Sequence, residues 1–189
     1  MSRDVGTLTV ICGSMFSGKS EEVIRRVKWA RIADKKVQVF KPKVDNRYSE
    51  TQVVTHYGSS VDCEIVENGL DIYTLVDMDT ELIVIDEVQF FSDELISSIR
   101  SIKRFMGIDI VVSGLDMWAD GNPIPLVGQL LCIADEIHKL KAVCVETGED
   151  AYISHRTVEA VGNVVVGGAE SYVALSEKSF LKATGIFKD

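Results

Sequence analysis

The sequence predicts an α/β protein in which helices pack on both faces of a parallel β-sheet. Three apolar runs, at 7–12, 81–87 and 108–115, have the composition of strands that are buried on both sides. Segments with helical periodicity, at 20–33 and 92–106, alternate with strands along the chain. This alternation is typical of parallel sheets, because the crossover between two parallel strands is usually a helix.

The first part of the chain begins with a strand and a helix. TLTVIC, at 7–12, is a buried strand that leads directly into a glycine-rich loop. The helix expected at 20–33 has apolar residues at helical spacing, namely Val23, Ile24, Val27 and Ala30. KKVQVFKP, at 35–42, is a second strand that ends at Pro42, and the polar segment 43–60 is expected to be mostly loop.

Two further strands and a helix follow. ELIVIDE, at 81–87, is a short apolar strand that ends in two carboxylates. The helix expected at 92–106 has Ser92 as its N-cap, and its apolar face comprises Leu95, Ile96, Ile99, Ile102 and Phe105. IDIVVSGL, at 108–115, is another buried strand.

The character of the sequence changes after about Lys141. From there the chain lacks long helical patterns and contains short β-like pieces, AYISH and NVVV, followed by a double glycine at 167–168 and by Tyr172. We therefore expect two units: the main α/β domain at 1–141 and a small β-rich unit at 142–189.

Composition and charge limit the class of protein. The 189 residues are 46% hydrophobic, as expected for a packed globular chain. No apolar run approaches the roughly 20 residues that cross a bilayer, and MSRDVGTLTVIC lacks the features of a signal peptide, so we expect a cytoplasmic protein without a membrane partner. The net charge of −9 repels phosphate backbones and argues against nucleic acid as a partner.

A phosphate-binding motif follows the first strand. GSMFSGKS matches G-x-x-x-x-G-K-S/T without deviation. Its glycines let backbone N–H groups surround the phosphates, Lys19 places a charge near the β- and γ-phosphates, and Ser20 can ligate Mg²⁺. The following helix adds the positive end of its dipole. We expect the whole motif to bind ATP: Gly13, Ser14, Met15, Phe16, Ser17, Gly18, Lys19 and Ser20.

Two carboxylates end the strand ELIVIDE. Asp86 is expected to hold Mg²⁺ through water. In ATPases a second carboxylate orients water, whereas in small-molecule kinases it accepts the proton of a substrate hydroxyl. These residues alone leave both classes open for Glu87. Both motifs lie where strands end, which is the edge at which open α/β sheets bind ligands.

Four motifs occur in order: GSMFSGKS, DEVQFF (86–91), SGLD (113–116) and GGAESY (167–172). Together they resemble the type II thymidine kinases, a cellular class that is also found in many bacteria and large DNA viruses. The resemblance runs from residue 7 to about residue 182. It implies a P-loop NTPase (RecA-like) parallel sheet flanked by helices, a P-loop kinase domain at 1–141, and a small β-rich lasso domain at 142–189.

The resemblance also implies an activity. Such enzymes transfer the γ-phosphate of ATP to the 5′-hydroxyl of thymidine, and we extend this to deoxyuridine, with ATP and Mg²⁺ as cofactors. The family further implies a homotetramer that the end product, thymidine triphosphate, inhibits. The alternative is a P-loop ATPase or a nucleotide-switched module that binds a protein.

Site residues follow from the resemblance position by position. It implies that Glu87 is the base that takes the 5′-hydroxyl proton. Besides the glycine-rich loop, the ATP and Mg²⁺ site would contain Asp45, Asn46, Arg47, Asp86 and Gln89. The nucleoside site would contain Met15, Phe90, Leu115, Ala119, Ser154, Asn163, Val164, Val165, Val166, Gly167 and Tyr172. Ser154 stands where family members usually carry Thr.

Two departures from the family pattern stand out. The family closes its small domain with four zinc ligands, but here Cys144 alone remains, and Thr147, Ser176 and Ser179 occupy the other positions. One thiolate cannot form a tetrahedral zinc site, so we expect no zinc and a unit held by apolar contacts, among them Val143, Val145, Ile153, Val165 and Phe180. In GLDMWADGNPIPL, the family's aromatic positions near the base carry Ala119 and Ile124, next to Trp118.

Overall fold

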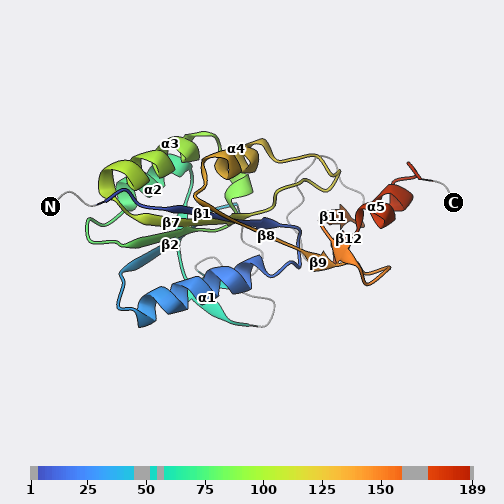
Figure 1. Ribbon diagram of the computed structural model, residues 1–189, viewed down its shortest axis with the longest axis horizontal. Helices are drawn as coiled ribbons and strands as arrows, with labels where there is room; N and C mark the ends of the chain where they lie inside the picture. The colour runs from blue at the N-terminus through green and yellow to red at the C-terminus, as the bar shows by residue number, and fades with distance from the viewer. Residues whose placement is uncertain (1–3, 45–51, 55–57, 159–169, 188–189) are drawn as a thin grey trace.

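The computed structural model describes residues 4–44, 52–54, 58–158 and 170–187. A six-stranded sheet runs through the larger part of the molecule, and a smaller unit lies beyond the carboxyl edge of this sheet (Figure 1). Helices cover both faces of the sheet. The predicted α/β fold class is confirmed.

The strand order in the sheet is β5-β2-β6-β7-β1-β8, and every adjacent pair is parallel. The strands are β1 (Leu8–Gly13), β2 (Val37–Pro42), β5 (Glu64–Val66), β6 (Leu82–Ile85), β7 (Asp109–Gly114) and β8 (Glu136–Leu140). β1 and β6 are buried along their whole length. This burial on both faces explains their continuous apolar composition.

Helix α1 (Lys19–Ile32) lies on one face of the sheet, while α2 (Gly69–Leu75), α3 (Glu94–Ser101) and α4 (Pro125–Ile133) lie on the other (Figure 1). The buried side of α1 consists of the four residues that the helical spacing predicts: Val23, Ile24, Val27 and Ala30. They pack against Val84 of β6 and Val111 of β7.

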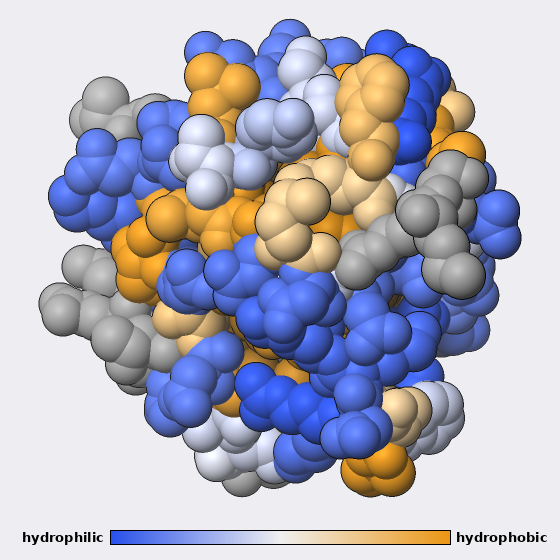
Figure 2. Space-filling model, turned by 90° about the vertical axis from the view of Figure 1, so that its left-hand side faces the viewer, coloured by the Kyte–Doolittle hydropathy of each residue, from blue (hydrophilic) through white to orange (hydrophobic). Residues whose placement is uncertain are grey.

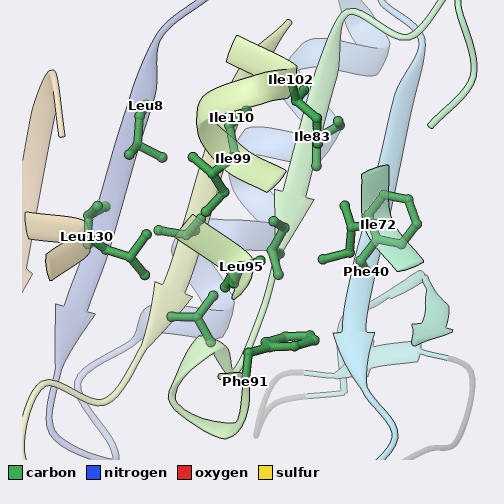
Figure 3. Close-up of a cluster of buried hydrophobic side chains, with 14 of the residues drawn as sticks. Leu8, Phe40, Ile72, Ile83, Phe91, Leu95, Ile99, Ile102, Ile110 and Leu130 are labelled. Atoms are coloured by element: carbon green, nitrogen blue, oxygen red, sulfur yellow. The ribbon is translucent and has the colours of Figure 1, made fainter. Parts of the chain in front are cut away.

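The larger core lies between the sheet and the helices α2, α3 and α4. Figure 3 shows side chains from these helices, from the segments next to them and from the strands meeting in one layer: Leu8, Phe40, Ile72, Ile83, Phe91, Leu95, Ile99, Ile102, Ile110 and Leu130. Two packed layers thus hold the strands from opposite faces. The strand ends that carry the motifs are therefore firmly placed.

The helix expected at 92–106 differs in two respects. Its N-cap is Asp93 rather than Ser92, whose hydroxyl donates to the Glu94 carboxylate at 2.6 Å. Its last segment, Ile102–Met106, is a π-helix. The wider turn moves Phe105 off the apolar face, so this side chain is 81% exposed instead of buried.

Several elements are absent from the sequence prediction. β3 (Gln52–Val54), within the part expected to be mostly loop, pairs antiparallel with β4 (Ser60–Asp62), which begins at the end of that part. The patterns also did not predict β5, α2, α4 and β8. A local signal for α2 is present, because Asn68 and Asp71 form a capping box at its start.

Within its described residues, the small unit contains two antiparallel strand pairs and one helix. β9 (Ala142–Val143) pairs with β10 (Asp150–Ala151), β11 (Ile153–Arg156) pairs with β12 (Tyr172–Leu175), and α5 (Glu177–Ala183) follows. Its own apolar cluster comprises Ala142, Cys144, Ala151, Ile153, Ala174, Leu175 and Phe180. Ile153 and Phe180 are thus buried as expected. Val143 and Val145 are not, because both side chains are about two-thirds exposed, at 67% and 65%.

Figure 2 shows the opposite end of the molecule, where the parallel strands begin. Hydrophilic residues cover most of this face and surround an apolar band across its middle. The sequence motifs lie at the other end, where the strands finish. Within the described ranges, no helix is both long and apolar enough to cross a bilayer.

Candidate active site

The carboxyl edge of the sheet brings the motifs together. β1 runs into the glycine-rich loop, β6 runs into Asp86, and β7 ends at Gly114. β7 lies between β1 and β6, so the glycine-rich loop and Asp86 start from strands about 10 Å apart. Both motifs therefore lie at the same edge of the sheet.

The glycine-rich loop depends on its glycines. Gly13 has a φ of 144°, and a Cβ at this position would lie 2.3 Å from the carbonyl oxygen of Leu140 in β8. Gly18 adopts the left-handed conformation, with a φ of 86°, as the N-cap of α1. Both positions favour glycine, which lets the chain turn tightly between β1 and α1.

Two side chains of the loop fold back on its own backbone. The Ser17 hydroxyl donates to the Ser14 carbonyl at 2.8 Å, and Lys19 Nζ donates to the same carbonyl at 2.7 Å. The lysine ammonium therefore lies over the loop itself. This is the position in which it can bind phosphates that the loop cradles.

The loop is also joined to the small unit. The backbone N–H of Met15 donates to Ser154 Oγ in β11 at 2.8 Å. The Ser14 hydroxyl donates to the carbonyl of Ala151 in β10 at 3.4 Å. Ser154, which the family resemblance assigns to the nucleoside site, thus contacts the expected ATP site directly.

Asp86 and Glu87 follow β6 in different conformations. The Asp86 side chain is buried, and the backbone N–H of Asp86 donates to the carbonyl of Phe40 in β2 at 2.9 Å. Glu87 has a φ of 54° and a ψ of 42°, which is a left-handed conformation for a residue other than glycine. Such a conformation costs about 1–3 kcal/mol and is concentrated at functional sites. It ends the strand and starts the short 3₁₀ turn η1 (Val88–Phe90).

Gln89 lies between Glu87 and β7. Its Nε2 donates to Glu87 Oε2, and its Oε1 accepts from the backbone N–H of Leu115 at 3.1 Å. The family resemblance groups Gln89 with the ATP and Mg²⁺ residues. In the structure its hydrogen bonds go to the expected base and to the end of the neighbouring strand.

An ion pair that the sequence patterns do not predict lies close to the glycine-rich loop. Lys139 Nζ, in β8, lies 2.9 Å from Oδ2 of the buried Asp116, which follows β7. A hydrogen bond to Asp116 raises the pKa of Lys139. Burial and, to a smaller extent, the charge of Asp116 raise the pKa of Cys12 to about 11. Cys12, one residue before the loop, is therefore a neutral thiol at neutral pH.

The remaining nucleoside residues are only partly within the described part of the chain. Phe90, Leu115 and Ala119 are half-buried near the ends of β6 and β7. Tyr172 is 6% exposed and lies in β12 opposite Arg156. The other expected site residues lie outside the described residues: Asp45, Asn46, Arg47, Asn163, Val164, Val165, Val166 and Gly167.

The four positions that the family resemblance aligns with zinc ligands come together in the small unit. Cys144 Sγ lies 3.5 Å from Ser179 Oγ, and the Ser179 N–H donates to Ser176 Oγ at 3.4 Å. Thr147 also hydrogen-bonds the Cys144 sulfur. One thiol and three hydroxyls do not fit Zn²⁺, which prefers thiolate and imidazole ligands. In the ranges that the structure describes, no three His, Cys, Asp or Glu side chains gather as a metal site.

A parallel α/β sheet with this glycine-rich loop and an acidic strand end defines a P-loop nucleotide-binding protein. A family model described as "Thymidine kinase" matches residues 6–180. A thymidine kinase of Bacteroides thetaiotaomicron is 42% identical over 184 residues, which cover 97% of this chain and 92% of the relative. A thymidine kinase of Bacteroides fragilis is 39% identical over 182 residues, covering 96% and 90%. The chain belongs to the thymidine kinase family, and the family predicted from the motifs is confirmed.

Proposed function

We propose that this chain transfers the γ-phosphate of ATP to the 5′-hydroxyl of thymidine and of deoxyuridine. The observation that carries the proposal is the position of Glu87. Glu87 follows the end of β6, which β7 separates from β1, the strand that enters the glycine-rich loop. The hydrogen bonds of Gln89 join the Glu87 carboxylate to the end of β7. A base at this place serves a substrate hydroxyl whose phosphate donor lies in the loop.

The ATP side of the site is built from the loop and α1. Backbone N–H groups and the N-terminus of α1 favour the triphosphate, and Lys19 adds a positive charge. Ser20 and Asp86 supply oxygen donors, which suit Mg²⁺, and they would hold this ion. When bound, Mg²⁺ neutralises part of the phosphate charge.

Glu87 carries out the proton transfer. It accepts the proton of the 5′-hydroxyl as the hydroxyl oxygen forms a bond to the γ-phosphorus. The bond between this phosphorus and the oxygen that bridges to the β-phosphate breaks, and ADP leaves with the bonding electrons. The products are the nucleoside monophosphate and ADP.

The nucleoside side combines residues of both units. Residues 1–141 act as the kinase domain and residues 142–189 as the lasso domain. The nucleoside would be bound by Met15, Phe90, Leu115, Ala119, Ser154, Tyr172 and the segment 163–167. Asp45 and Arg47 would act at the 5′-hydroxyl and the phosphates, and Asn46 at the ATP and Mg²⁺ site. The hydrogen bond between Met15 and Ser154 supports this assignment, since it joins the two units at the loop.

The family resemblance extends the proposal to the assembled protein. We expect a homotetramer in the cytoplasm, and inhibition by thymidine triphosphate, which would occupy the same phosphate and nucleoside sites. Size measurement by light scattering and a titration of the initial rate with thymidine triphosphate test these two points.

The activity test compares ADP release with and without a nucleoside. A kinase releases ADP only when thymidine is present and forms one monophosphate for each ADP. Deoxyuridine in place of thymidine tests the second substrate. A P-loop ATPase, the alternative class, would release ADP at the same rate without any nucleoside, and this outcome would contradict the proposal.

A further inference from the structure

One carboxamide connects the expected base with the neighbouring strand. Gln89 is 5% exposed and lies in the 3₁₀ turn directly after Glu87. Its Nε2 donates to Glu87 Oε2, and its Oε1 accepts from the Leu115 N–H at 3.1 Å. Water has little access to this group, so both hydrogen bonds are formed in a protein environment, where they are stronger than in bulk water.

The partners of this carboxamide determine its orientation. The backbone N–H of Leu115 can only donate, so the oxygen of Gln89 must face it. The amide NH₂ group must then face Glu87, whose carboxylate accepts. The fit is close at Gly114, where a Cβ would lie 2.6 Å from Gln89 Oε1 and 2.8 Å from Val88 Cγ2. Glycine at this position therefore permits the carboxamide to reach β7.

We propose that Gln89 is a positioning residue, which holds the Glu87 carboxylate in the orientation that accepts the substrate's proton. This inference rests on the proposed function, in which Glu87 is the base. Glu87 leaves β6 in a left-handed conformation, so the strand itself does not direct its side chain. The carboxamide supplies that direction by tying the carboxylate to the end of β7.

Loss of the hydrogen bonds from Gln89 to Glu87 and Leu115 should slow the chemical step. Gln89→Leu has a similar size but forms neither hydrogen bond. We expect kcat to fall about 10- to 100-fold, because small displacements of a reacting group have effects of this order. KM for thymidine and ATP should change less than about threefold, since both hydrogen bonds of the Gln89 carboxamide go to protein groups.

Gln38 offers a matched control. It is also buried, its Oε1 accepts from the backbone N–H of Asp77 at 2.9 Å, and its Nε2 donates to the Glu64 carboxylate at 3.1 Å. It lies near the amino end of β2, away from the motifs. Gln38→Leu should therefore lower the melting temperature while leaving kcat unchanged.

The test is a double-mutant cycle on kcat with Gln89→Leu, Glu87→Gln and both changes together, on proteins shown to be folded by near-ultraviolet circular dichroism. We expect Gln89→Leu to lower kcat in the wild type and to have no further effect in the Glu87→Gln background. If Gln89→Leu does not fold, Gln89→Glu replaces it, since it keeps an acceptor for Leu115 but loses the donor to Glu87.

The outcomes separate this inference from the proposed function. Additive effects on kcat, or a wild-type kcat in the Gln89 variant, would overturn the positioning role and leave Glu87 as the base. A wild-type kcat in Glu87→Gln would overturn both.

Discussion

The backbone N–H of Met15 donates to the hydroxyl of Ser154 at 2.8 Å. Met15 belongs to the glycine-rich loop, and Ser154 belongs to β11 of the small unit. The part of the molecule expected to bind ATP is therefore tied to the unit expected to cover the nucleoside. A substitution at Ser154 should therefore affect the binding of both ATP and the nucleoside.

Ser154→Ala removes the acceptor for the Met15 N–H. We expect KM for ATP and KM for thymidine each to rise about fivefold, because a neutral hydrogen bond contributes about 1 kcal/mol. Ser154→Thr keeps the hydroxyl and should restore both values. Steady-state kinetics with each substrate varied in turn measure this. If Ser154→Ala raises neither KM, the hydrogen bond does not link the two sites.

Lys19→Met tests the phosphate loop. The ammonium, which donates to the Ser14 carbonyl at 2.7 Å, is expected to face the phosphates during transfer. Its loss should lower kcat/KM by at least about 100-fold, as for other removed charge-stabilising groups. The melting temperature should change little. Lys28→Met, an exposed lysine on the same helix, is the control and should remain active. An active Lys19→Met enzyme would contradict the assignment of the loop.

The pKa of Cys144 predicts a pH dependence of stability. Burial opposes ionisation, but hydrogen bonds from Ser179 and Thr147 and from backbone N–H groups outweigh it and lower the pKa to about 6 from an ordinary value of 9.0. Because the pKa of Cys144 is lower in the folded than in the unfolded state, the ionised thiolate stabilises the fold. This stabilisation is fully present at a pH above the pKa of the unfolded chain, and it is lost as the pH falls toward 6.

Chemical denaturation between pH 6 and 9 measures this effect. The free energy of unfolding should rise with pH in wild type, and the rise should be smaller in Cys144→Ser, which does not ionise in this range. Cys63→Ser, at a half-buried cysteine outside the small unit, serves as the control. Identical pH profiles for wild type and Cys144→Ser would contradict the prediction.

Zinc removal should have no effect. Cys144, Thr147, Ser176 and Ser179 supply one sulfur and three hydroxyl oxygens, too few suitable donors for a structural zinc site. A chelator should change neither the melting temperature nor the activity once Mg²⁺ is restored. Elemental analysis of the purified protein provides the check, and about one zinc per chain would show that other residues act as ligands.

The sequence predicts the interior of the sheet better than its border. β1 and β6 are buried on both faces, so their residues are almost all apolar and are recognised at once. β8 is an edge strand in which each side chain is exposed or half-buried, and EIHKL has no continuous apolar run. Helix α3 was predicted too long, since nothing in its apolar spacing marks the change to a π-helix.

Some features of the candidate site could be predicted from the sequence, and others could not. The loop, Asp86 and Glu87 lie in short motifs whose chemistry can be read locally. The contacts of Gln89 with Leu115, of Met15 with Ser154 and of Lys139 with Asp116 join segments far apart in the chain. Such contacts arise from the strand order and the docking of the small unit, which the local sequence does not reveal.

Glu87→Gln tests the central proposal, a carboxylate base at the end of β6, most directly. The measurement is kcat for monophosphate formation together with ATP affinity, and Glu81→Gln, an exposed residue just before β6, is the control. We expect Glu87→Gln to lower kcat by about 10² to 10⁴-fold with ATP affinity unchanged, and Glu81→Gln to keep kcat. A wild-type kcat in Glu87→Gln, with only KM for ATP altered, would contradict the proposal.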